Sequence, residues 1–367
     1  MAKLKFCITG CGRIATLNVL GYKDHPGAEI YAVCDRDRAR AEALAAQTGA
    51  KKIYTDYNQA LEDKDIDVID LLVPHHLHRD MTIAACRAKK HISVQKPMAM
   101  TVAECDDMIG AARDNGVKLK VFENFVFYPP IVKAKKLIEE GEIGDISTIR
   151  LKMVAGDNRH GWKVEDATWL WRMEEKTCGG GPLVFDDGYH KFSLAYHFLG
   201  KPEKVFAFID KTPIPGALYE KPDGTKVQFY EDAPAMITWK ASGQRYGIFD
   251  ITYSPELEVN TDYYSCDERL EITGTKGIIW VTRCTGKMLQ EPSLTLYRDG
   301  QTRSWHAMRD DWSDSFMDST KDFIDAILLD RDPVLTGEEG KEITKFAIGA
   351  MESGKTGLPV NWDAETL

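Results

Sequence analysis

The feature that most constrains this 367-residue chain lies at its beginning. A short apolar run over residues 3–9 is followed at once by Gly10-Cys-Gly12-Arg-Ile-Ala15 and a helix-compatible run to residue 20. A strand, a glycine turn and a helix in this order form the dinucleotide-binding fingerprint GxGxxA in the context that it requires. Gly10 permits the tight turn, Gly12 lets the backbone approach a pyrophosphate, and Ala15 allows the helix to pack closely on the strand. The sequence therefore predicts a dinucleotide-binding fold.

An acidic residue at the end of the second expected strand indicates which dinucleotide binds. The strand runs from Glu29 to Cys34 and ends in Asp35, 20 positions after Ala15. A carboxylate there can accept hydrogen bonds from the adenosine ribose hydroxyls and would repel a 2′-phosphate, which favours NAD. Arg36 follows and could pair with such a phosphate, so NADP stays open. Asp35 could also merely cap the helix that starts near Asp37.

Strands and helices alternate over the rest of the first third. We expect further strands at 52–54, 68–73, the run before Lys96 and 118–122. We expect one helix that ends at Thr48, a short helix centred near Gln59, and two helices over 78–89 and 102–115. Such alternation implies a parallel, doubly wound α/β sheet covered on both faces. We therefore assign residues 1–124 to an NAD(P)-binding Rossmann domain.

The pattern changes after Tyr128-Pro129-Pro130. One helix is followed by strand-like segments at 147–154, 204–209, 235–241, 246–252, 269–273, 277–283 and 293–297. Short turns between several of them predict a large, mainly antiparallel sheet in an α+β domain over 125–367. The Pro/Gly-interrupted stretch 210–234 is a lid, an arm or a loose excursion. The last helix, at about 337–353, should pack back between the domains. A broad sheet with an open face also favours a homo-oligomer, whether dimer, tetramer or larger.

Charge and composition exclude several partners. The net charge is −10 and the basic residues are scattered, so neither a nucleic acid nor an anionic membrane is expected to bind. No apolar run approaches the roughly 20 residues that cross a bilayer, and the start lacks a signal-peptide pattern, which predicts a cytoplasmic protein. The eight cysteines lack zinc-ligand spacing and are expected to be small core residues, with Cys178 in a packing or loop role.

The stretch His91 to Thr101, HISVQKPMAMT, carries the first candidate catalytic residue. It predicts a strand, a loop and a helix that opens with a capping box from Thr101 to Glu104. Lys96 then lies on a loop at the carboxyl end of a strand, which is the edge where open parallel sheets bind ligands. Pro97 holds the lysine backbone extended.

Three histidines follow the preceding strand in Pro74-His75-His76-Leu77-His78. Without a nearby carboxylate they are a poor metal-ligand set, so we predict no metal site. We expect these side chains to face the nicotinamide end of the cofactor or to cap the next helix.

A second constellation is the stretch Gly179-Gly-Gly-Pro-Leu-Val-Phe-Asp186-Asp187-Gly-Tyr-His190. If a helix begins near the aspartates, Asp186 and His190 lie one turn apart and share a face, so they can present an acid/base pair to a cleft. A helix cap and a structural histidine would give the same pattern.

Taken in order, GCGRIA, CDRDRARAEALA, PHHLH, QKP and GGGPLVFDDGYH resemble the Gfo/Idh/MocA family of oxidoreductases over essentially the whole chain. The resemblance implies that Lys96 is the proton-transferring lysine of the family's Glu-Lys-Pro motif, with Asp186 and His190 completing the catalytic set. Two departures matter. Gln95 replaces the usual glutamate, which removes a negative charge beside Lys96. The glycine triplet lies one residue further from the aspartate than in the common pattern, so Asp187 is an alternative to Asp186.

The expected function is that of an NAD(P)-dependent sugar or polyol dehydrogenase acting on CH–OH in carbohydrate metabolism. It would oxidise or reduce a secondary hydroxyl of a sugar, polyol or glycoside by hydride transfer, with acid-base assistance from Lys96, His190 and Asp186. One alternative is a glycoside-cleaving enzyme that uses NAD for transient ring oxidation. Another is a non-catalytic NAD-binding regulator, because fold does not fix function.

The remaining site assignments follow from these motifs and from the resemblance. The expected cofactor-binding residues are Gly10, Gly12, Arg13, Ile14, Asp35, Arg36, Pro74, His75, His78, Lys96 and Pro97. The expected substrate-binding residues are Lys96, Asn124, Trp171, Arg172, Asp186, Asp187 and His190. Trp171-Arg172 resemble the family's substrate-wall segment. Trp162, Trp169 and Trp171 fit stacking on sugar faces, although core packing explains them as well.

Overall fold

The computed structural model describes residues 3–23, 25–157, 160–163, 166–220 and 224–363. The chain divides into two compact units. The first comprises Met1–Phe127 and Ser313–Thr344, and the second comprises Tyr128–Trp312 and Lys345–Leu367. The expected boundary after residue 124 lies close to Phe127, but residues 313–344, expected in the second domain, belong to the first unit.

The first unit is built on a parallel sheet in the order β3-β2-β1-β4-β5-β6. Its described strands are β1 (Leu4–Thr9), β2 (Ala28–Cys34), β3 (Lys52–Tyr54), β4 (Val68–Leu71), β5 (His91–Gln95) and β6 (Leu119–Phe122). Every pair is parallel, which confirms the predicted doubly wound fold. The strand order reverses between β1 and β4, so the carboxyl ends of these two strands flank the crevice where such sheets bind ligands.

The helices of this unit begin and end where the sequence signals place them. They are α1 (Ala15–Asn18), which continues into the 3₁₀ turn η1 (Val19–Tyr22), α2 (Arg38–Thr48), α3 (Tyr57–Glu62), α4 (His78–Arg87) and α5 (Val102–Asn115). Thr101 and Glu104 form the predicted capping box of α5. Gly49 and Gly116 end α2 and α5 with φ of 74° and 65°, a conformation that favours glycine.

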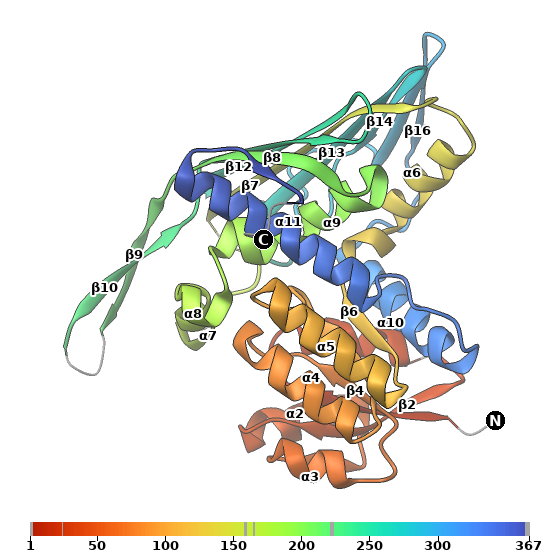
Figure 1. Cartoon of the computed structure of the whole chain (residues 1–367), viewed down its shortest axis with the longest axis vertical. Helices are drawn as coiled ribbons and strands as arrows, with labels where there is room; N and C mark the ends of the chain where they lie inside the picture. The colour runs from red at the N-terminus through yellow and green to blue at the C-terminus, as the bar shows by residue number, and fades with distance from the viewer. Residues whose placement is uncertain (1–2, 24, 158–159, 164–165, 221–223, 364–367) are drawn as a thin grey trace. The chain divides into compact units, whose positions relative to one another are not determined.

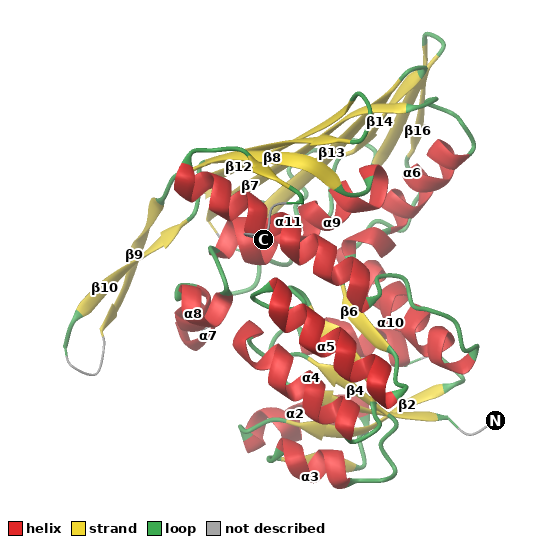
Figure 2. Cartoon of the chain, in the orientation of Figure 1, coloured by secondary structure: helices red, strands yellow, loops and turns green. Residues whose placement is uncertain are grey.

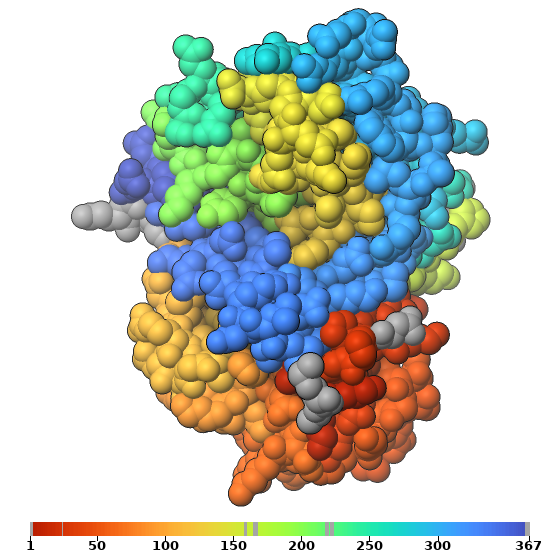
Figure 3. All heavy atoms as spheres, turned by 90° about the vertical axis from the view of Figure 1, so that its right-hand side faces the viewer, coloured from red at the N-terminus to blue at the C-terminus, as the bar shows by residue number. Residues whose placement is uncertain are grey.

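A late segment of the chain completes the first unit. Phe323 and Ile324 of α10 (Trp312–Leu328) pack in the same core as Phe6 of β1. Figure 3 shows the blue surface of this part of the chain directly against the red surface of the first residues. The sequence predicts the apolar face of such a helix, but periodicity does not reveal which sheet the face covers. The sequence pattern alone therefore leaves residues 313–344 with the second domain, where their neighbours in the sequence lie.

The second unit contains a larger sheet in the order β16-β15-β14-β13-β7-β12-β11-β8-β17. Its described strands are β7 (Ile146–Asp157), β8 (Pro202–Ile209), β11 (Ala235–Ala241), β12 (Arg245–Glu258), β13 (Cys266–Gly274), β14 (Gly277–Val281), β15 (Leu294–Arg298), β16 (Gln301–Trp305) and β17 (Val360–Asn361). Only the β7–β12 pair among these described strands is parallel, so the predicted mainly antiparallel sheet is confirmed. The strands β16 and β17 were not expected.

Helices cover one face of this sheet. Figure 2 shows α6 (Pro129–Glu139), α9 (Gly188–Leu199) and the last turns of α11 (Gly337–Thr356) on the same side. Strand β11 alternates buried and exposed residues, with Trp239 buried on the helix side. Met236 and, on β8, Phe208 are 52% and 65% exposed on the other side. The described part of the unit leaves this second face open.

The Pro/Gly-interrupted stretch forms a hairpin. Its strands are β9 (Thr212–Glu220) and β10 (Lys226–Glu231), and they pair antiparallel. Figure 1 shows the hairpin projecting away from the large sheet of its own unit. The described residues of this stretch therefore form paired strands rather than a loose excursion.

Two further observations concern the described residues. None of their helices is both long and apolar enough to cross a membrane. All eight cysteines are free, and all are buried except Cys11, which is half-buried.

Candidate functional site

The glycine loop after β1 has the shape that a dinucleotide requires. Gly10 has φ of 95°, and a Cβ there would overlap the carbonyl oxygen of Leu72 at the end of β4. At Gly12, a Cβ would meet no atom within 4 Å, so the backbone is bare toward open space. Ala15 is fully buried against the sheet. The small size of each of these three residues is thus explained by its surroundings, as the fingerprint predicts.

Asp35 is fixed at the carboxyl end of β2. Its Oδ2 accepts a hydrogen bond from the Cys11 main-chain N–H at 2.7 Å, and its Oδ1 accepts one from Asp37 at 2.8 Å. Asp37 itself caps α2, so Asp35 is not the helix cap. A carboxylate offers about four acceptor positions, so two stay open for further hydrogen bonds. The exposed Arg36 lies beside it.

The three histidines in and after the loop that follows β4 differ in how far they are buried. His76 is exposed, His75 is buried, and His78 is fully buried at the start of α4. The His78 ring nitrogens lie 2.9 Å from the carbonyl oxygens of Val73 and Pro97. Burial lowers the pKa of His78 to about 4, so the ring is neutral at ordinary pH. His78 joins the loops after β4 and β5 and does not cap α4 with its side chain.

Lys96 follows directly on β5. Its main-chain N–H donates to Oε1 of Gln95 at 2.9 Å, and its peptide bond to Pro97 is cis. The Lys96 side chain is half-buried, whereas Pro97 is buried. Because His78 contacts the Pro97 carbonyl, the backbone on both sides of Lys96 is held by neighbouring groups.

Asn124 ends up buried beside a residue that the sequence did not single out. Its Nδ2 donates to Oγ of Ser315 at 2.7 Å, and Ser315 belongs to α10. Both residues are buried. The sequence offers no signal for this contact, because 191 positions separate the two residues.

In the second unit, the glycine triplet leads into a π-helix. This helix, η4 (Pro182–Asp187), begins before the aspartates and continues into α9. A π turn holds one more residue than an α turn, which can accommodate the longer spacing between glycines and aspartates. Asp186 and His190 are each 5% exposed, and they lie on consecutive turns of this helical run.

Arg172 pairs with Asp186. It comes from α7 (Asp166–Arg172), and its Nε donates to Oδ2 of Asp186 at 2.7 Å. Its guanidinium also lies 4.3 Å from the centre of the Trp171 ring, within the range of a cation–π contact. Burial alone would lower the pKa of Arg172, but the Asp186 carboxylate raises it above its ordinary value. Arg172 is therefore an ionised partner of Asp186.

Asp187 has a different partner. Its Oδ2 accepts from Nζ of the buried Lys191 at 2.6 Å, and Lys191 also lies 3.4 Å from Oε1 of Glu268. Burial would lower the pKa of Lys191, but Asp187 and Glu268 raise it above its ordinary value. A lysine four positions after an aspartate on a helix can form an ion pair with it, so the sequence itself contained a signal for this contact.

Trp162 and Trp171 have different surroundings. Trp162 contacts the rings of Tyr263, Tyr264 and Trp312, so it belongs to an aromatic cluster of the second unit. Trp171 instead lies against Arg172. Among the described residues, no three or more His, Cys, Asp and Glu side chains are grouped so that they could hold a metal ion.

The predicted site residues thus fall into two sets. The glycine loop, Asp35, Lys96 and Asn124 belong to the first unit, and Arg172, Asp186, Asp187 and His190 belong to the second.

Comparisons with known proteins identify a family match in each of the two units. Residues 4–123 match the family described as "Oxidoreductase family, NAD-binding Rossmann fold", and residues 131–280 match the "GFO/IDH/MocA C-terminal domain". The D-apiose dehydrogenase of Rhizobium rhizogenes is 32% identical over 330 residues, which cover 86% of this chain and 88% of the relative. The myo-inositol 2-dehydrogenase of Thermotoga maritima is 24% identical over 95% of this chain and 96% of its own length. A levoglucosan dehydrogenase solved with NADH and levoglucosan has a TM-score of 0.81 at 22% identity, covering 99% of this chain and 100% of its own.

Proposed function

The chain belongs to the Gfo/Idh/MocA family of NAD-binding oxidoreductases, and from this premise we propose that it oxidises or reduces a secondary hydroxyl of a sugar or polyol with NAD. The observation that carries the proposal is Lys96, held at the carboxyl end of β5 in the same sheet as the glycine loop. The names of the relatives support the substrate class, because they are dehydrogenases of apiose, inositol and levoglucosan.

The first unit would hold the cofactor. Gly10 and Gly12 would let the backbone approach the pyrophosphate, with Arg13 and Ile14 beside it. The open acceptor positions of Asp35 would bind the ribose hydroxyls of the adenosine, and its charge would disfavour a 2′-phosphate. Bound NAD supplies the hydride acceptor or donor at its nicotinamide.

The acid–base work would be shared by Lys96, His190 and Asp186. We expect Lys96 and His190 to contact the reacting hydroxyl, where one of them accepts or returns its proton. Asp186 would orient and support the base, because its own position is fixed by Arg172. Gln95 stands where the family's motif usually has a glutamate, so the side chain next to Lys96 in the sequence carries no charge.

The test is to mix the purified protein with NAD and a panel of polyols, aldoses and anhydrosugars, and to follow the absorbance of NADH. At least one compound should give turnover, and NADP should support it less well than NAD. Binding of NAD without turnover on any member of the panel would contradict the proposal.

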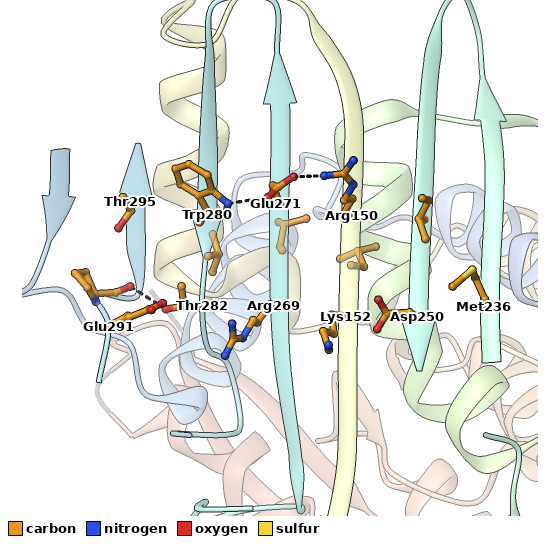
Figure 4. A pocket seen from close by; sticks show the side chains of 15 residues that line it. Arg150, Lys152, Met236, Asp250, Arg269, Glu271, Trp280, Thr282, Glu291 and Thr295 are labelled. Carbon is orange, nitrogen blue, oxygen red and sulfur yellow. Dashed lines mark hydrogen bonds and ion pairs between the residues drawn. The ribbon is translucent and has the colours of Figure 1, made fainter. Parts of the chain in front are cut away.

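We also propose that the chain forms a homo-oligomer through the open face of the large sheet. This face carries the exposed apolar side chains of Phe208, Met236, Tyr246 and Ile248. Met236 and Ile248 also line a shallow groove of about 740 Å³, in which Glu271 binds Arg150 and Trp280 (Figure 4). Exposed apolar side chains gathered on one open face favour a protein–protein interface.

A further inference from the structure

The first turn of the helix that carries Asp186 lacks a side-chain cap of its own. The residue in the N-cap position of η4 is Gly181, which has no side chain, and the helix begins with Pro182. The main-chain N–H groups in the first turn of a helix have no partner within the helix, so they need one from elsewhere.

Asp232 supplies this partner from a distant part of the chain. Its Oδ1 accepts from the Leu183 N–H at 2.7 Å, and its Oδ2 accepts from the Val184 N–H at 3.0 Å. Asp232 is 3% exposed and directly follows β10, at the foot of the hairpin. A carboxylate at this end of a helix is also favoured by the helix dipole. Burial raises the pKa of Asp232 to about 6, so it is ionised at neutral pH.

Gly181 makes this contact possible. A Cβ at this position would overlap Oδ2 of Asp232. The Gly181 backbone has φ of −84° and ψ of 157°, which any residue adopts without strain. Glycine is therefore required here by the approach of Asp232 and not by the backbone conformation.

We propose that Asp232, at the foot of the β9–β10 hairpin, is a positioning residue for the reaction. Asp232 fixes the first turn of η4 and thereby places Asp186. This role rests on the proposed function, because it acts through the acid–base set.

Two variants test the Asp232 contact from opposite sides. Asp232→Asn replaces one acceptor oxygen by an amide nitrogen, which cannot accept, so one of the two hydrogen bonds to Leu183 and Val184 is lost. Gly181→Ala keeps Asp232 but displaces its carboxylate. Each should lower kcat by about tenfold or more while the NAD dissociation constant stays unchanged, because the glycine loop belongs to the other unit. The double variant should lose no more than the larger single loss, since both changes remove one contact.

Asp210→Asn is the matched control. Asp210 precedes β9 at the foot of the same hairpin but is exposed, so its change should leave kcat unaltered. An unchanged kcat in both Asp232→Asn and Gly181→Ala would overturn the positioning role.

Hydrogen exchange separates this inference from the proposed function. The amides of Leu183 and Val184 should exchange faster in Asp232→Asn than in wild type, whether or not a substrate is known. If the wild-type protein oxidises no sugar or polyol, the proposed function fails, and exchange still decides whether Asp232 fixes η4. Unchanged exchange at both amides would refute the contact itself.

Discussion

At the scale of single residues, we propose that the charge of Asp35 decides cofactor choice, because its position is fixed. Both of its oxygens already accept a main-chain hydrogen bond, so the carboxylate cannot easily turn away from a bound nucleotide. The sequence predicted this residue from its distance to the glycine loop. It could not predict the bond to Cys11, because that contact depends on how the loop after β1 lies against the end of β2.

The first prediction concerns this charge. Asp35→Asn keeps the shape of the side chain and removes the repulsion of a 2′-phosphate. We expect the preference for NAD over NADP, measured as the ratio of kcat/KM values, to fall by about tenfold, or roughly 1.4 kcal/mol. Asp37→Asn, which changes the cap of α2 instead, is the control and should leave the ratio intact. A ratio that is the same in wild type and Asp35→Asn would refute the assignment.

A second prediction concerns Asp70 in the core of the first unit. It is fully buried and accepts a hydrogen bond from the Tyr22 hydroxyl at 2.9 Å. Burial raises the pKa of Asp70 to about 6, from an ordinary value of 3.8. The folded state therefore binds a proton more tightly than the unfolded state, so this residue's contribution to stability falls as the pH rises from about 4 to about 6.

Asp70→Asn should remove this dependence. The free energy of unfolding of wild type, relative to the variant, should fall by roughly 2–3 kcal/mol between about pH 4 and pH 7, as measured by urea denaturation. Asp114→Asn on the surface of α5 is the control, because Asp114 is 67% exposed. A difference that stays flat over this range would show that Asp70 does not titrate as described.

At the scale of secondary-structure elements, α9 is anchored to β13 through one buried cation. Lys191 of α9 contacts Asp187 at the end of η4 and Glu268 of β13. The sequence predicted a helix near the aspartates, and the structure shows that it begins earlier, as a π-helix. A π turn has no sequence signal comparable to a cap or a glycine stop, so local pattern alone could not predict it.

Lys191→Met tests this anchor. Removing the ammonium group leaves the buried Glu268 carboxylate and the half-buried Asp187 carboxylate without their cation, which should lower the free energy of unfolding by about 3 kcal/mol. Adding Glu268→Gln should recover part of the loss, because it removes one of the two charges. Lys176→Met changes a lysine whose side chain is 78% exposed and should have little effect. A loss as small as that of Lys176→Met would contradict the anchor.

At the scale of the whole molecule, the sequence predicted both sheets but not the full path of the chain between them. The doubly wound sheet follows from alternating strands and helices, and the second sheet follows from strands joined by short turns. The return of residues 313–344 to the first unit depends on packing between segments about 300 positions apart, such as Phe6 and Phe323. The pairing of Arg172 with Asp186 could likewise not be predicted, because it depends on the fold bringing α7 beside η4.

The open face of the large sheet carries the prediction at this scale. Phe208→Asp places a charge among the exposed apolar side chains of this face, so it should shift the protein to a smaller oligomer in sedimentation or light-scattering measurements. Leu329→Asp is the control, because Leu329 is 70% exposed but belongs to the first unit. A wild-type protein that is already monomeric, or a Phe208→Asp variant of unchanged mass, would exclude this interface.

The central proposal is that Lys96 and His190 both take part in one reaction. A double-mutant cycle of Lys96→Met and His190→Asn, measured as kcat/KM on the sugar or polyol that is turned over, tests it most directly. NAD binding should be retained in all three variants. If the two residues act as a unit, the double variant should be about as slow as the slower single variant. Losses that simply multiply, or single variants with wild-type rates, would contradict the account.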